Sequence, residues 1–320
     1  MLDNIIEIHG KKVVLLEHAI TNNLLPDPSL ADVWVINHND PKLVKRFLYK
    51  IIRSEDIRIN LKPIFLQKEL KKVYSLSSDL LKSLSDGYIK WLNFIDKIPY
   101  IETINNFIEK NQYKYDNFDK TSDEFYTFKI LNYYYTRKKN IVPIINRKSL
   151  TGYSYTRIEA FFENKNDAYT KSRMLLREAF LGGSLARNYV DTSHLCKNCH
   201  SGFLNFREIC PKCTNHNLKV RNLIHHFRCA YVGIDKDFVL KDKLACPKCS
   251  SELKNLGVDY DKPGKIFLCK NKKCNHEFQD APVGVHCVDC KTEQSPDELI
   301  VKKIYAYELT NLGYQQVIEQ

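Results

Sequence analysis

The chain has 320 residues, of which 43% are hydrophobic and 27% charged, a composition that excludes wholesale disorder and leaves room for two or three folded domains. No apolar run approaches the ~20 residues of a membrane span, and the first residues lack a signal-peptide pattern, so we expect a cytoplasmic protein with no membrane partner. The formal charge of +11 favours anionic partners, although metal-bound thiolates would reduce it by 5 in the metal scheme proposed below.

The first third of the chain predicts an α/β domain. The runs "KKVVLL", "ADVWVINH" and "LKPIFLQ" are short, apolar and rich in β-branched residues, as buried strands are. Between the last two, "PKLVKRFLYKIIRSED" places Leu43, Phe47, Leu48 and Ile51 on one side of a helix. Strands that alternate with helices indicate a parallel sheet.

This order of alternating strands and helices resembles the receiver domain of response regulators, which implies a flavodoxin-like fold over residues 1–115. Asn37 stands where a receiver has its phosphorylated aspartate, Gln67 where it has Thr or Ser, and Lys90 near its usual lysine, while Glu17 is all that remains of its acidic pair. An amide cannot form an acyl phosphate, and Mg²⁺ has little reason to bind without a carboxylate cluster. The resemblance therefore implies a degenerate pseudo-receiver that docks or forms a homodimer; an unrelated α/β domain is the alternative.

Residues 116–192 predict a helical segment. Phe125, Phe128, Leu131 and Tyr135 recur at steps of three and four, the spacing of a core-facing stripe. A second helix stops at Gly182-Gly183 before a short strand, so a winged helix is one interpretation. If the segment bound nucleic acid, the candidate phosphate contacts would be Arg137, Lys138 and Lys139.

Ten of the eleven cysteines form five close pairs, which in a reduced compartment indicate metal ligands rather than disulfides. The spacing suggests one tetrahedral site from the first two pairs and another from the next two. The first comprises Cys196, Cys199, Cys210 and Cys213; the second comprises Cys246, Cys249, Cys269 and Cys274.

Eleven thiols cannot fill three tetrahedral sites, so one histidine is needed. His226 stands three residues before the solitary Cys229, and the two would form a third site with the last pair, Cys287 and Cys290; His225 is the alternative ligand. The other interpretation makes Cys229 a free buried thiol. Four protein ligands per ion predict three structural zinc ions in a zinc-ribbon array over residues 193–295, followed by a C-terminal helix or tail over 296–320.

The stretches "CKNCHSGFLNFREICPKC", "LIHHFRC", "LKNLGVDYDKP" and "FLCKNKKC" resemble the thaumarchaeal output domain family of predicted metal-binding modules, over about residues 125–295. The resemblance implies a signalling output module behind a receiver-like input.

No Gly-rich phosphate loop, nucleophile elbow or Glu-bearing zinc motif is present, so we do not expect an enzyme. The sequence predicts a zinc-binding regulatory protein that engages a protein partner. The alternative is a nucleic-acid-binding transcriptional regulator. In that case Lys270, Lys272 and Lys273, which lie between Cys269 and Cys274, would add phosphate contacts.

Overall fold

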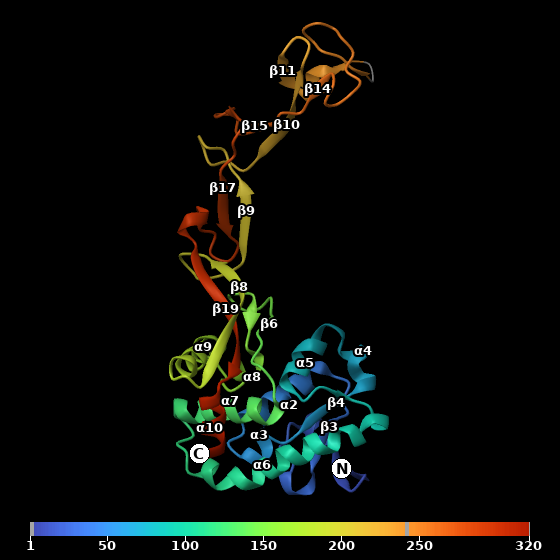
Figure 1. The fold of residues 1–320 in the computed structure, drawn as a ribbon, viewed down its shortest axis with the longest axis vertical. Coiled ribbons are helices and arrows are strands. Elements are labelled where there is room, and N and C mark those ends of the chain that lie inside the picture. Colours follow the sequence, from blue (N-terminus) through green and yellow to red (C-terminus); the bar gives the residue numbers. More distant parts are fainter. Residues whose placement is uncertain (1–2, 241–242, 320) are drawn as a thin grey trace. The chain divides into compact units, whose positions relative to one another are not determined.

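The computed structural model describes residues 3–240 and 243–319 and divides the chain into two compact units (Figure 1). The first unit comprises residues 1–192 together with 303–320, and the second comprises residues 193–302. The expected boundary between residues 115 and 116 does not separate compact units, and the last 18 residues join the first unit.

A five-stranded mixed sheet forms the centre of the first unit. Its order is β1-β2-β3-β4-β5; β1 is antiparallel to β2, and the other neighbours are parallel. This order differs from the 2-1-3-4-5 order of flavodoxin-like sheets because a hairpin strand occupies the edge, so the flavodoxin-like assignment is not confirmed. The strands are β1 Asn4–Ile8, β2 Lys11–Leu16, β3 Val33–Ile36, β4 Ile64–Gln67 and β5 Tyr88–Ile89.

Helices cover both faces of this sheet, since successive strand residues point to opposite sides. Val33, Val35 and Phe65 pack toward α6, whereas Trp34 and Ile36 pack toward α2. The helices in this part are α1 His18–Asn22, α2 Pro41–Arg53, α3 Ile57–Asn60, α4 Lys71–Tyr74, α5 Ser78–Leu84 and α6 Ile98–Asp116.

The same hydrophobic core continues into the following helices, where Leu131, Leu176 and Val317 join the cluster that contains Trp34. The remaining helices of the unit are α7 Asp123–Arg137, α8 Thr156–Glu159, α9 Lys165–Leu181 and α10 Asn311–Glu319. Two short strands, β6 Ile144–Ile145 and β7 Tyr153–Ser154, pair with each other.

The expected helix, glycine stop and strand are present as α9, Gly183 with φ +77°, and β8 Leu185–Leu195. The partner of β8 is β19, Ile300–Leu309, from the far end of the chain. A winged helix is therefore not confirmed. Through β8 and β19 the chain enters the second unit and returns.

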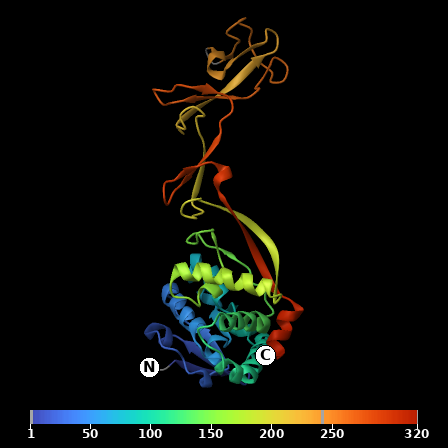
Figure 2. The same cartoon turned by 90° about the vertical axis from the view of Figure 1, so that its left-hand side faces the viewer.

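The second unit consists of short antiparallel strands with nested pairing. β9 pairs with β17, and between them in the sequence β10 pairs with β15; β9 and β17 lie side by side in Figure 2 as well. The strands are β9 Leu204–Glu208, β10 Leu218–His226, β11 Tyr231–Ile234, β12 Val239–Leu240, β13 Lys243–Leu244, β14 Tyr260–Asp261, β15 Lys265–Cys269, β16 Glu277–Phe278, β17 Val283–Cys287 and β18 Glu293–Gln294.

Candidate metal centres

The structure gathers twelve side chains of the second unit into three groups that could each hold a metal ion. In each group the four ligand atoms lie within 4.8 Å of one another. Cluster I is Cys196, Cys199, Cys287 and Cys290; cluster II is Cys210, Cys213, Cys269 and Cys274; cluster III is His226, Cys229, Cys246 and Cys249.

These are the twelve side chains proposed from the sequence, but the expected grouping is wrong. The sequence interpretation joined the first pair to the second, the third to the fourth, and His226 and Cys229 to the last pair. The structure instead joins the first pair to the last, the second pair to Cys269/Cys274, and His226 and Cys229 to Cys246/Cys249. The physical reason is strand pairing. Leu204 faces Cys287 across β9 and β17, and Leu218 faces Cys269 across β10 and β15. Each strand pairing therefore brings together two cysteine pairs that are distant in the sequence.

The sulfur–sulfur distances fit a tetrahedron around one ion. They are 3.6 and 3.5 Å in cluster I for Cys196–Cys290 and Cys199–Cys287, and 3.8 Å for Cys210–Cys274 in cluster II. A tetrahedron with metal–sulfur bonds of about 2.3 Å has edges of about 3.8 Å. A disulfide would bring its sulfurs to about 2.05 Å, so these are not disulfide pairs.

Each of the six ligand pairs, five of two cysteines and one of His226 with Cys229, forms a tight turn, here called a knuckle. All six knuckles share one backbone conformation. The residue directly after the second ligand is non-glycine and has a positive φ in each of them, at 43–61°. These six residues are His200, Thr214, Ala230, Ser250, Asn275 and Lys291. Left-handed backbone in such residues costs on the order of 1 kcal/mol each. The same strained conformation follows the second ligand of all six pairs, as expected of a backbone that brings two ligands together.

This conformation turns backbone N–H groups toward the sulfurs. Two residues after the second ligand, Ser251 and Thr292 each hydrogen-bond to the sulfur through the side-chain hydroxyl and the backbone N–H. These bonds lower the pKa of Cys249 to about 6 and of Cys290 to about 5. Burial instead raises the pKa of Cys199 to about 12. One thiolate in a cluster opposes ionisation of its neighbours, so a bound cation is needed to hold all four ligands deprotonated. The hydroxyl two residues after the cysteine was visible as a repeated Ser or Thr, but the sequence interpretation did not use it.

His226, not His225, is the imidazole of cluster III. Its Nδ1 lies 3.2 Å from the Cys229 sulfur and 3.5 Å from the Cys249 sulfur, and the side chain is buried. The neighbouring His225 is directed away by the alternation of β10, and its Nδ1 lies 3.3 Å from Asp261 Oδ1.

The predicted nucleic-acid contacts divide into two sets. Arg137 is excluded because its side chain is 1% exposed and its Nε donates to Asp86 Oδ1 at 3.1 Å, so the predicted phosphate contact is wrong. The others are exposed on the surface of their own units: Lys138, Lys139, Lys270, Lys272 and Lys273.

The positions compared with a receiver lie where parallel strands end: Asn37 follows β3, Gln67 ends β4 and Lys90 follows β5. Within the described part of the first unit, no group of His, Cys, Asp and Glu side chains has metal-binding geometry. The receiver interpretation is not confirmed.

The family model described as thaumarchaeal output domain 1 matches residues 119–309 of this chain, a wider span than the resemblance suggested. It therefore covers α7 to β19, including all three clusters. No curated protein and no solved structure matches. Among residues 3–240 and 243–319, no helix has the length and apolar character to cross a membrane.

Proposed function

The chain belongs to the thaumarchaeal output domain 1 family, and on that premise we propose that it is a non-enzymatic signalling protein whose three clusters bind structural zinc and shape a surface for a protein partner. The observation that carries this proposal is the geometry of the clusters, each of which offers four protein ligands at tetrahedral spacing.

The donor set favours zinc in a structural role. Thiolates with one imidazole are ligands for a soft, tetrahedral ion, and eleven sulfurs with one nitrogen fit Zn²⁺ better than Mg²⁺ or Ca²⁺. A catalytic zinc keeps a position for water, whereas here each ion would have four protein ligands. The ions would supply the folding energy that these short strands lack.

The charge of the loaded second unit favours a protein partner. Residues 193–302 contain 18 Lys and Arg and 13 Asp and Glu. Two four-thiolate zinc sites carry −2 each and the third carries −1, which brings the formal charge of the unit to about zero. A surface without net charge gives little long-range attraction for nucleic acid.

Exposed apolar side chains on β9 and β17 give such a partner a place to bind. Phe206 and Val283 lie on the same face of the pair, because Phe206 faces Val285 and Glu208 faces Val283. Both are about half exposed, as are Phe203 before β9 and Val288 after β17. Exposed apolar side chains that gather on paired segments are typical of interaction sites.

The proposal is tested by affinity capture with zinc-loaded protein and two charged variants. Phe206→Asp should abolish capture of the partner, and Val239→Asp, at an equally exposed apolar position of the same unit, should retain it. Equal capture by both variants would contradict a partner site on β9 and β17. Turnover of a substrate by the loaded protein would contradict the non-enzymatic role.

The first unit would provide docking or homodimerisation in this scheme. Among the described strands, its edge strand β1 pairs with β2 alone, and β1 exposes Ile5, so it offers backbone groups to a second sheet. Sedimentation of the full chain with and without Ile5→Lys tests this. A monomer in both cases would refute the dimer.

A local cation group supports nucleic acid as the second candidate. Lys219 and Arg221 share one face of β10, and the pKa of Lys219 is lowered chiefly by Arg221, with further contributions from burial, Lys270 and Lys236. A binder that uses these side chains should lose affinity steeply as salt rises, and Arg221→Glu should reduce that slope. Absence of oligonucleotide binding at low salt would remove this candidate.

A further inference from the structure

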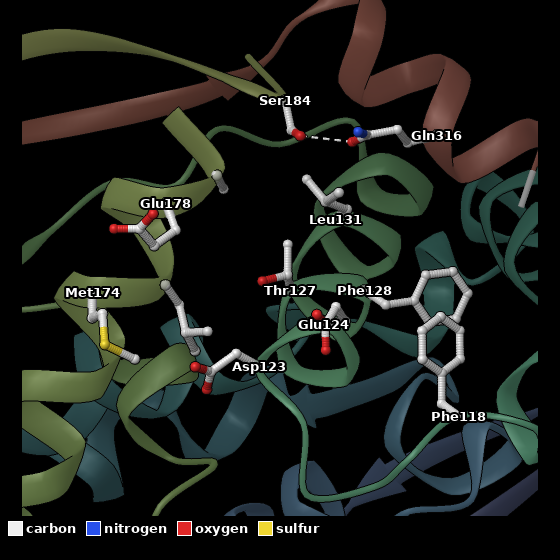
Figure 3. Close-up of a pocket in the computed structure, with 12 residues that line it drawn as sticks. Phe118, Asp123, Glu124, Thr127, Phe128, Leu131, Met174, Glu178, Ser184 and Gln316 are labelled. Atoms are coloured by element: carbon white, nitrogen blue, oxygen red, sulfur yellow. Dashed lines mark hydrogen bonds between the residues drawn. The ribbon is translucent and has the colours of Figure 1, made fainter. Parts of the chain in front are cut away.

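A cavity of about 390 Å³ lies in the first unit between α7 and α9. Figure 3 shows Thr127 and Leu131 of α7 on one side and Met174 and Glu178 of α9 on the other. At one end, Ser184 Oγ, directly before β8, donates a hydrogen bond to Gln316 Oε1 of α10 at 2.6 Å. The volume is at the lower end of the range for small-molecule sites.

The floor of the cavity is apolar and its rim is acidic. Phe128, Leu131, Leu175 and Ala179 form the floor and are almost fully buried. Met174 adds an exposed, flexible thioether at the edge, of the kind that adapts to varied apolar ligands.

Three carboxylates lie at the rim, two from the first turn of α7 and one from α9. They are Asp123, Glu124 and Glu178, and all three are exposed. Among the described residues, no Lys, Arg or His lies within ion-pair distance of any of them, although the whole chain has 49 basic and 38 acidic residues. In a chain with surplus cations, an apolar cavity thus carries only negative charge at its rim.

We propose that this cavity binds a small organic ammonium ion, a protonated amine on an apolar body. The apolar body would occupy the floor, where burial of its surface provides most of the affinity. The ammonium group would remain at the wet rim, where three carboxylates attract it and select against neutral and anionic molecules of the same shape. Ser184 and Gln316 lie at one end of the cavity, where their hydroxyl and amide could receive a polar group of the ligand.

Calorimetric titration of the zinc-loaded full chain tests the proposal with 2-phenylethylammonium as the probe. Two comparison compounds separate the contributions: 3-phenylpropionate keeps the apolar body and reverses the charge, and methylammonium keeps the charge alone. We expect measurable binding of the first probe only, weakened by added salt because the rim is exposed.

Charge-neutralising variants locate the site. Asp123→Asn combined with Glu178→Gln should weaken binding of 2-phenylethylammonium about 5-fold to 20-fold, as expected for two exposed charge contacts. The matched control combines Asp79→Asn, in the first turn of α5, with Glu109→Gln, exposed on α6, and should leave the affinity unchanged. Circular dichroism establishes that both double variants are folded.

Four results would overturn the proposal: no heat of binding with 2-phenylethylammonium, equal binding of 3-phenylpropionate, equal binding of methylammonium, or equal affinity in the rim and control variants. Each is independent of partner capture by β9 and β17, so the cavity and the proposed function can fail separately.

Discussion

The nested grouping of ligands predicts which cysteine pairs share an ion. Removing Cys199 and Cys290 together removes two ligands of cluster I, so two ions per chain should remain. Removing Cys199 and Cys213 removes one ligand each from clusters I and II, so only one should remain. Sequential grouping, as first inferred from the spacing, predicts the reverse for both double variants.

The number of ions lost per chain follows from the number of ligands that each site keeps. Structural zinc in small domains binds with an apparent free energy of about 10–16 kcal/mol, and a site reduced to three ligands loses its closed tetrahedron. Alanine replaces each cysteine so that no weak oxygen ligand remains. Metal per chain is measured by elemental analysis after equilibration with a competing chelator that leaves the wild-type protein at three ions.

A matched histidine pair provides the control. His226→Ala should reduce the count to two, because Nδ1 of this residue lies within 3.5 Å of two sulfurs, while His225→Ala should retain three. One ion in the Cys199/Cys290 variant, or two in the Cys199/Cys213 variant, would refute the nested grouping.

Three further predictions concern lability, pH and packing. Chelator titration should remove the ion of cluster III first, since Cys249 is its exposed ligand and His226 replaces a fourth thiolate; simultaneous loss of all ions would contradict this. Burial lowers the pKa of Lys129 to about 7 in the folded chain. Between pH 7 and 10.5 this side chain is therefore protonated in the unfolded chain and neutral in the folded chain. The free energy of unfolding should rise with pH across that window by an amount on the order of 5 kcal/mol. In Lys129→Met this contribution to the slope of the unfolding free energy should vanish, and an unchanged slope would contradict it. Gly313→Ala should destabilise the first unit by about 1–3 kcal/mol in denaturant unfolding, because its Cβ would lie 2.2 Å from the Ser184 carbonyl oxygen, whereas Gly264→Ala, with open space around it, should not.

The twelve candidate ligands were predictable from the sequence because the spacing within each pair is a local property. Cys229 and His226 are three residues apart, and no distant information is needed to see that both can reach one ion. Their grouping was not predictable, because it depends on which strands pair. The partner of β9 begins at Val283, more than 70 residues later, and short strands carry no local signal of their partner.

The fold shows the same division between local and distant information. The apolar runs around Val35 and Phe65 predicted buried parallel strands, and Gly183 predicted a helix end, since each depends on neighbours in sequence. Sheet order was set instead by an added hairpin strand. Arg137 was a candidate phosphate contact, which requires an exposed side chain, and only the distant Asp86 explains why it can be buried.

That buried pair also shows why the first unit does not divide near residue 115. Burial alone opposes ionisation of Asp86, but Arg137 and the Tyr100 hydroxyl reverse this, so its pKa is lowered overall. Arg137 also donates to the Leu61 carbonyl oxygen at 2.7 Å, and thereby joins α7 to the loop before β4. A chain cut before α7 would leave Asp86 as a buried charge without its counter-ion, which typically destabilises a fold by about 3–5 kcal/mol. The sheet that was compared with a separate receiver domain is thus part of the same compact unit as helices α7 to α9, which the family model covers.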